Sequence, residues 1–111
     1  MALNKSLTEL TRRLEYSFRQ PELLERALTH RSKSAVNYER LEFLGDSVLG
    51  FAISSELYNR YPGLYEGELT RLRASLVKKE TLAALARELD LGNYLRLGEG
   101  ELKSGGYDRD S

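Results

Sequence analysis

Three acidic residues at helical spacing, Glu39, Glu42 and Asp46, are the part of the sequence best suited to chemistry. At about 100° per residue of an α-helix, their side chains fall within a roughly 60° arc. Glu42 therefore repels a like charge on each side, at a cost of a few tenths of a kcal/mol per pair on an exposed helix. A hard cation such as Mg²⁺ would offset this repulsion, because it binds carboxylate oxygens and keeps several waters. The spacing favours a metal half-site, and the alternative is a solvated face neutralised by bases such as Arg40.

The helix that carries the acids is predicted to run from about Glu39 to about Tyr61, where the Pro-Gly pair at 62–63 ends it. Its apolar residues lie first opposite the acids and later on the acid side: Leu41, Leu44, Val48 and Ala52, then Leu49, Ile53 and Leu57. A helix that is apolar nearly all round is expected to be central and buried. Gly45 and Gly50 each cost about 1 kcal/mol relative to alanine inside a helix, so we expect close backbone approach there.

The remaining sequence predicts helices and loops without strands. Leucines recur at helical spacing over about 3–14, 21–28, 69–77 and 82–89. Pro21 suits the first turn of the second of these helices. The glycine-rich tail after Gly92 is expected to be a loop, and no strict strand alternation occurs. The fold class is therefore predicted to be all-α.

His30 is the only histidine in the sequence. Histidine titrates near neutrality, which suits a general base or a metal ligand. The alternative is that His30 satisfies backbone groups at the turn after the helix over 21–28. The absence of a neighbouring second ligand favours the turn.

The composition is balanced, with 17 Lys plus Arg and 17 Asp plus Glu, so overall charge does not indicate a nucleic-acid partner. The densest basic stretch, Arg71, Arg73, Lys78 and Lys79, is either a solvated face or a local nucleic-acid site. The sequence has no cysteine, which excludes disulfides and thiolate metal sites. It shows no signal peptide and no membrane-length apolar run, so we expect a soluble, cytoplasmic protein without a membrane partner.

Three stretches give a family resemblance. The run Glu-Arg-Leu-Glu-Phe-Leu-Gly-Asp-Ser at 39–47 resembles the signature of the ribonuclease III family. The runs Leu-Thr-His-Arg-Ser at 28–32 and Gly-Glu-Leu-Lys-Ser-Gly-Gly at 100–106 resemble flanking stretches of its bacterial members. The resemblance implies a helical endonuclease domain that hydrolyses phosphodiester bonds of double-stranded RNA with Mg²⁺, or with Mn²⁺ as a substitute. The usual substrates are precursors of ribosomal and messenger RNA.

The resemblance also implies roles for four acids. Glu42 and Asp46 are expected to be direct metal ligands, with Asp46 the residue most tied to turnover. Glu39 and Glu66 are expected in the outer part of the catalytic site, where they would orient water or a second ion. Glu68 is better explained as a negative charge at the start of a helix.

Phe43 projects on the acid side of the helix rather than with the first leucines. By pattern alone it is either a core residue or part of an interface. In the family, the matching phenylalanine packs into a socket of the partner across a two-fold dimer, which implies a homodimer interface for Phe43.

Bacterial family members continue from the Gly-Gly loop into a helix that bears an aspartate and a glutamate, and then into a double-stranded-RNA-binding domain. This sequence ends at Ser111, before either, and Asp108 and Asp110 do not take their place. We therefore expect residues 1–111 to be a catalytic domain without its last catalytic helix, and to be inactive alone. The rival hypothesis is a non-catalytic module that dimerises or binds RNA without cleaving it.

Overall fold

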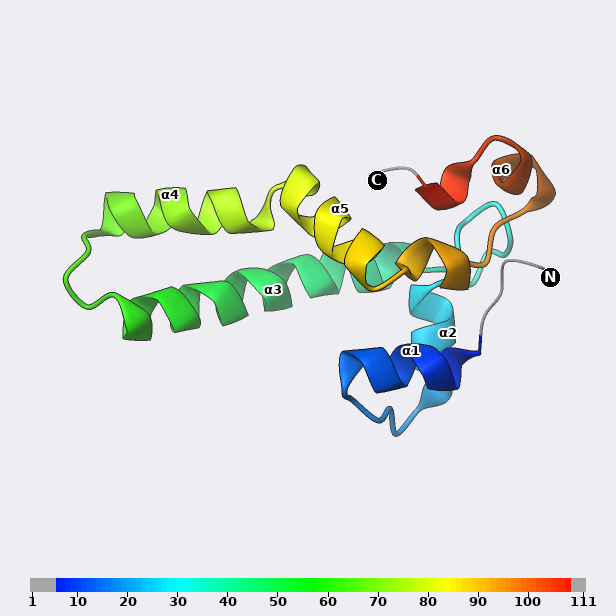
Figure 1. Ribbon diagram of the computed structural model, residues 1–111, viewed down its shortest axis with the longest axis horizontal. Coiled ribbons are helices and arrows are strands. Elements are labelled where there is room, and N and C mark those ends of the chain that lie inside the picture. The colour runs from blue at the N-terminus through cyan, green and yellow to red at the C-terminus, as the bar shows by residue number, and fades with distance from the viewer. Residues whose placement is uncertain (1–5, 109–111) are drawn as a thin grey trace.

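The computed structural model describes residues 6–108, and this part of the chain is helical (Figure 1). Its elements are α1 (Leu7–Leu14), α2 (Pro21–Ala27), α3 (Glu39–Arg60), α4 (Glu66–Val77), α5 (Lys79–Glu88), the 3₁₀ helix η1 (Leu91–Tyr94), α6 (Glu99–Lys103) and the 3₁₀ helix η2 (Gly106–Asp108). Among the described residues the only strand-like pairing is an isolated parallel bridge between Thr29 and Arg96. The prediction of an all-α fold is confirmed.

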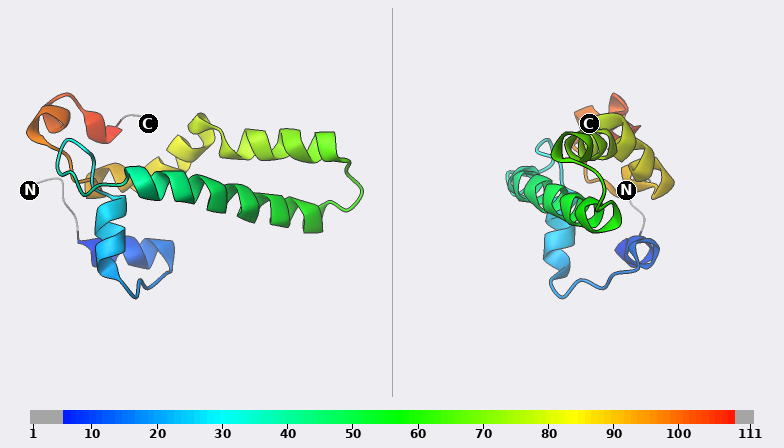
Figure 2. Two further views of the ribbon diagram at one scale, coloured as in Figure 1. Left: turned by 180° about the vertical axis from the view of Figure 1, so that it is seen from behind. Right: turned by 90° about the vertical axis from the view of Figure 1, so that its left-hand side faces the viewer.

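The molecule is elongated, with principal extents of 50 × 31 × 25 Å. Helices α3 and α4 pack against each other as an antiparallel hairpin, and the turn between them lies at one end of the molecule (Figures 1 and 2). The other end, here called the base, contains α1, α2, η1, α6 and η2, together with the start of α3 (Figure 2). Helix α5 connects α4 back to the base.

The base holds the best-packed core of the described chain. Leu10, Leu24, Leu28 and Tyr94 form a buried cluster, so α1, α2 and η1 meet although they are far apart in the sequence. Leu3, the first leucine of the expected pattern, lies outside the described residues. The amphipathic spacing of the leucines therefore positions a core at the end of the molecule where α3 begins.

Local signals set the helix ends as expected. Pro21 occupies the first turn of α2, where its missing N–H costs no helical hydrogen bond. Helix α3 ends at Arg60, and the chain turns through Pro62 and Gly63 before α4 begins. The predicted limits of the acid-bearing helix are confirmed within one residue.

The expectation that α3 is buried on all sides is wrong for this chain. Leu57 is its one buried residue, at 6% exposure, whereas Leu44 and Val48 are each 59% exposed. The reason is that α4 packs along only one side of α3. An added Cβ at Gly45 or Gly50 would also meet nothing within 4 Å, so no described segment makes the expected close approach.

The stretch after Gly92 is also more ordered than predicted, because it forms η1, α6 and η2. Helix α6 spans five residues, too few to be stable alone in water. Its preceding residue, Gly98, donates its N–H to Ser32 Oγ at 2.8 Å, so a contact with the loop before α3 stabilises it. Within residues 6–108, no helix has both the length and the apolar character required to cross a bilayer.

Candidate functional site

The three predicted acids lie together on the first two turns of α3. Glu39, Glu42 and Asp46 are all exposed, and their spacing of three and four residues puts them on one face of the helix. We call these three residues the acid face. It starts at the base and covers about 10 Å of the helix axis, at 1.5 Å per residue.

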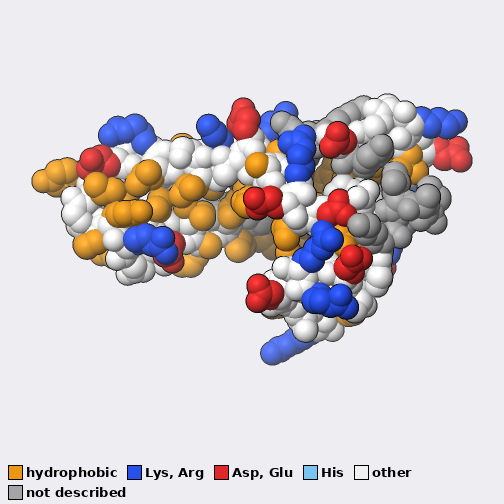
Figure 3. All heavy atoms as spheres, viewed as in Figure 1, with side chains coloured by type: hydrophobic (Ala, Val, Ile, Leu, Met, Phe, Trp, Pro, Cys, Tyr) orange, Lys and Arg blue, Asp and Glu red, His pale blue; other side chains and the backbone are white. Residues whose placement is uncertain are grey.

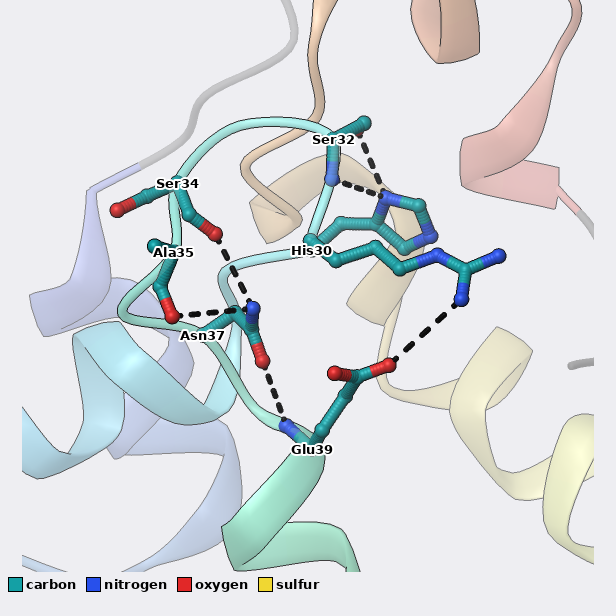
Figure 4. A network of polar contacts seen from close by, with 7 residues as sticks. His30, Ser32, Ser34, Ala35, Asn37 and Glu39 are labelled. Carbon is teal, nitrogen blue, oxygen red and sulfur yellow. Dashed lines mark hydrogen bonds and ion pairs between the residues drawn. The ribbon is translucent and has the colours of Figure 1, made fainter.

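The N-cap residue of α3, Tyr38, makes no side-chain capping hydrogen bond, but an Asx-turn at Asn37 leads into the helix. Asn37 Oδ1 accepts the backbone N–H of Glu39 at 3.0 Å (Figure 4). The Asn37 amide also donates to the carbonyl oxygens of Ser34 at 3.1 Å and Ala35 at 3.3 Å. Asn37 therefore joins the preceding loop to the first turn of the acid face.

The charges of the acid face are only partly compensated within the chain. Arg31, rather than Arg40, pairs with Glu39, at 3.8 Å between two exposed side chains (Figure 4). An exposed pair at this distance contributes little to stability. In the described chain, neither Glu42 nor Asp46 has an ion pair, so their oxygens are open to solvent and to a ligand.

Glu42 and Asp46 fit a hydrated divalent cation in their donor chemistry. Magnesium binds through one or two carboxylates and retains several waters, which matches two neighbouring exposed carboxylates. Residues 6–108 contain no cluster of three or more acidic or histidine side chains arranged to hold a metal ion. The acid face thus offers two neighbouring exposed carboxylates, Glu42 and Asp46, as donors for such a cation.

Glu66 lies far from the acid face within the same chain. It begins α4 at the turn of the hairpin, whereas Glu42 is near the base (Figure 1). From Glu42 to Arg60 at the end of α3 the helix rises about 27 Å, at 1.5 Å per residue. Glu68 Oε1 accepts the N–H of Tyr65 at 3.1 Å, which supports its predicted role at the helix start.

His30 has the turn role that the sequence favoured. Its Nδ1 accepts the backbone N–H of Ser32 at 3.0 Å and lies 2.8 Å from Ser32 Oγ (Figure 4). The ring also meets the ring of Tyr38 edge to face, with centroids 5.7 Å apart. In the described chain, His30 belongs to no group of three or more metal-binding side chains.

Tyr38, which the sequence analysis did not single out, adjoins the acid face. Burial raises the pKa of its phenol, and the negative charges of Glu42 and Glu39 raise that pKa further, while Arg31 opposes them. Glu101 of α6 adds a smaller upward shift in the same pKa. Tyr38 therefore remains a hydrogen-bond donor within the field of carboxylates from α3 and α6.

A cavity of about 460 Å³ joins these elements, and its lining includes His30, Tyr38 and Glu101. Glu101 is separated from the acid face by more than fifty residues of sequence, so no periodicity could have predicted their proximity. The sequence signal that could have pointed to Tyr38 was its position directly before Glu39.

Phe43 is not a core residue of this chain, because it is 80% exposed. Phe51 and Tyr58, which are 75% and 73% exposed, lie within about 80° of Phe43 around the helix. We call these three residues the aromatic stripe. Figure 3 shows hydrophobic side chains along the length of the hairpin on the viewed face.

The basic stretch divides into two parts. Arg73 donates to Ser54 Oγ at 2.9 Å and so links α4 to α3. Arg71, Lys78 and Lys79 are exposed. The stretch thus supplies one contact between helices and three exposed cations.

The sequence matches a family model described as Ribonuclease-III-like over residues 20–111. Curated relatives named Ribonuclease 3 include one from Vibrio vulnificus strain YJ016, 57% identical over 109 residues, which are 98% of this chain and 48% of the relative. Another, from Methylococcus capsulatus, is 62% identical over 107 residues, which are 96% of this chain and 46% of the relative. The chain thus spans about half the length of these relatives.

Two solved structures of the nuclease domain of ribonuclease III from Campylobacter jejuni are also similar. One superposes with a TM-score of 0.91 at 38% identity, covering 95% of this chain and 74% of that chain. It is described in terms of structural flexibility in the region involved in dimer formation. The other has a TM-score of 0.90 at 37% identity and covers 96% of this chain and 73% of that chain.

Proposed function

Because this chain belongs to the Ribonuclease-III-like family, we propose that it forms part of the catalytic domain of a metal-dependent endonuclease that hydrolyses double-stranded RNA. The observation that carries the proposal is the acid face, which lies inside the matched region and exposes Glu42 and Asp46 to solvent. By the same relationship, its substrates are precursors of ribosomal and messenger RNA. Because the relatives named above are bacterial, we expect the enzyme to meet this RNA in the cytoplasm.

The acids have different proposed roles according to their positions. Glu42 and Asp46 bind the ion, Mg²⁺ or Mn²⁺, and Glu39 orients water at the start of the helix. When bound, the ion lowers the pKa of a coordinated water and stabilises negative charge on the phosphate. Asn37 supports this arrangement by fixing the backbone of Glu39.

The aromatic stripe supports a homodimer. Exposed aromatic residues in line on one helix resemble the anchors found at interface centres. A two-fold axis perpendicular to α3 would place two such stripes antiparallel, so each is covered by the other. The same symmetry would bring Glu66 of one subunit toward the acid face of its partner, which accounts for its distance from Glu42 within one chain.

Duplex RNA is recognised mainly by its shape, its phosphates and its 2′-hydroxyls. The exposed Arg71, Lys78 and Lys79 are suited to phosphate contacts, since they are cationic and are not involved in the described ion pairs. Two subunits would offer one acid face to each strand of the duplex.

The test is cleavage of a labelled RNA duplex by the full chain encoded by the gene, with and without Mg²⁺. Glu42→Gln is expected to reduce metal-dependent cleavage by at least about 100-fold, because it removes a direct ligand. Glu56→Gln is the matched control, since Glu56 is an exposed acid on the same helix that pairs with Arg60 at 2.6 Å. Unchanged cleavage by Glu42→Gln would refute its role as a ligand.

The rival proposal, a module that dimerises or binds RNA without cleaving it, is favoured by the small donor set of the acid face, Glu42 and Asp46, in the described chain. RNA binding without cleavage by the full wild-type chain would establish it. Residues 1–111 alone are expected to bind Mg²⁺ weakly and not to cleave, and cleavage by this piece would show that its acids suffice.

A further inference from the structure

The loop before α3 is closed by a backbone hydrogen bond between its own ends and is joined by two more to a distant segment at Arg96. The N–H of His30 donates to the carbonyl oxygen of Arg96 at 2.9 Å. The N–H of Arg96 donates to the carbonyl oxygen of Leu28 at 2.8 Å. The N–H of Tyr38 donates to the carbonyl oxygen of Thr29 at 3.0 Å, which joins the two ends of the loop. The residue before the acid face is therefore attached to the segment that leads into α6.

His30 and Ser32 of this loop form a chain of hydrogen bonds with Gly98, the residue before α6. Gly98 N–H donates to Ser32 Oγ at 2.8 Å, and Ser32 N–H donates to His30 Nδ1 at 3.0 Å. Ser32 Oγ lies 2.8 Å from the same nitrogen, and since Nδ1 accepts the Ser32 N–H it has no proton of its own, so the hydroxyl is the donor of this pair (Figure 4). His30 Nδ1 must then be an acceptor, and the neutral ring carries its proton on Nε2.

Gly98 can only approach this loop because it lacks a side chain. An added Cβ would lie 2.5 Å from the carbonyl oxygen of Ser32 and 3.0 Å from its carbonyl carbon. Gly98 immediately precedes α6, which carries Glu101. The position of α6 therefore depends on the contact between Gly98 and Ser32.

On its other side, the His30 ring contacts the first turn of α3 through Tyr38. The two rings are edge to face, with an interplanar angle of 70°. The Tyr38 carbonyl accepts the N–H of Glu42 at 2.8 Å, and Tyr38 directly precedes Glu39. His30 thus lies between α6 and the acid face.

We propose that His30 is a positioning residue, whose Nδ1 acts through Ser32 and Gly98 to hold the loop, α6 and the acid face in one arrangement for metal binding. The proposal rests on the proposed function of the acid face. In this role His30 neither binds the metal nor transfers a proton, and its Nε2 is not required.

Two substitutions separate the ring nitrogens. In His30→Asn, the side-chain oxygen can accept the N–H two residues on, as in an Asx-turn, and so replaces Nδ1. In His30→Gln, the longer side chain places its polar end near the position of Nε2. Both variants lose the ring contact with Tyr38, so comparing them isolates the acceptor at Nδ1.

The first measurement is the Mg²⁺ concentration for half-maximal cleavage by the full chain. His30→Gln is expected to raise it by about 10 to 100-fold, as loss of a supporting partner does at other metal sites, while His30→Asn stays within about 3-fold of the wild type. Ser34→Ala is the control, since that hydroxyl lies in the same loop and accepts only the N–H of Val36 in the described structure. If His30→Asn raises the required Mg²⁺ concentration as much as His30→Gln does, the proposal is overturned.

A second measurement does not depend on cleavage. The ¹⁵N signals of the His30 ring should show Nδ1 unprotonated, and the amides of Ser32 and Gly98 should keep their exchange protection in His30→Asn but lose it in His30→Gln. A proton on Nδ1 would overturn the proposal even in an active enzyme. If the wild type does not cleave RNA, the proposed function fails, and calorimetric Mg²⁺ binding by the two variants decides the role of His30.

Discussion

Replacing Gly98 with alanine tests how closely α6 packs against the loop before α3. The new Cβ would lie 2.5 Å from the Ser32 carbonyl oxygen, a backbone atom that cannot rotate aside as a side-chain end can. The φ of Gly98 is −69°, which suits alanine. The cost is therefore steric, and the two segments must separate.

The magnitude follows from two contributions. Overpacking at a tight contact costs about 1 to 3 kcal/mol. Separation also weakens the hydrogen bond from Gly98 to Ser32, whose net contribution is about 1 kcal/mol. The expected destabilisation is thus about 2 to 4 kcal/mol, which lowers the Tm of a domain of this size by at least about 6 °C.

Thermal unfolding of the full chain, followed by far-ultraviolet circular dichroism, measures this loss. Gly100→Ala is the matched control, because its Cβ would meet nothing within 4 Å and it lies inside α6. Alanine is the better helix former, so the control should be unchanged or up to about 1 kcal/mol more stable. Equal melting temperatures for the two variants would refute the close contact between Gly98 and Ser32.

Phe43→Ala should weaken dimerisation by about 2 kcal/mol or more, roughly 30-fold in Kd, in sedimentation at low micromolar concentration. Tyr38 should ionise at a higher pH than an ordinary tyrosine, and Glu42→Gln should shift its raised pKa part of the way back, as measured by ultraviolet absorbance of tyrosinate. Because the phenolate is disfavoured in the folded state, stability should fall as the pH rises through the alkaline range. Asn37→Ala should cost about 1 kcal/mol of unfolding free energy in urea denaturation, by loss of the Asx-turn hydrogen bond from the N–H of Glu39.

Each of these predictions has a control and a contrary result. Val36→Ala removes an exposed apolar side chain away from the aromatic stripe, and an equal effect on sedimentation would show that Phe43 is ordinary surface. Tyr38→Phe must remove the titration assigned to Tyr38. Asn59→Ala deletes an exposed amide that bonds only to the carbonyl oxygen of Ser55 in the described structure, so a loss as large as that of Asn37→Ala would contradict the role of the Asx-turn at Asn37.

The sequence was most informative where the determinants of structure are local. Pro21 and the Pro-Gly pair at 62–63 act through their own backbone conformations, so the limits of α2 and α3 were predicted well. The helical register of Glu39, Glu42 and Asp46 follows from spacing alone. These signals require no knowledge of the neighbouring elements.

Features that depend on distant partners were not predictable. The exposure of Leu44 and Val48 depends on how many helices pack around α3. An apolar residue type alone does not reveal whether its side chain is buried. Helix α6 is too short for intrinsic propensity to reveal, because its stability comes from contacts such as that between Gly98 and Ser32. The proximity of Glu101 to Tyr38 depends on the same packing.

The unequal burial of the base and the hairpin also bears on how the chain unfolds. The base contains the buried cluster around Leu10 and Tyr94, whereas α3 buries only Leu57 and α4 buries no residue. Regions with few buried contacts open at lower free energy, so amide exchange should be faster along the hairpin than in the base. A second subunit that covers the aromatic stripe would bind only the ordered hairpin and would therefore stabilise it by mass action. The hairpin of α3 and α4, which carries the acid face, would then become more ordered as the protein concentration increases.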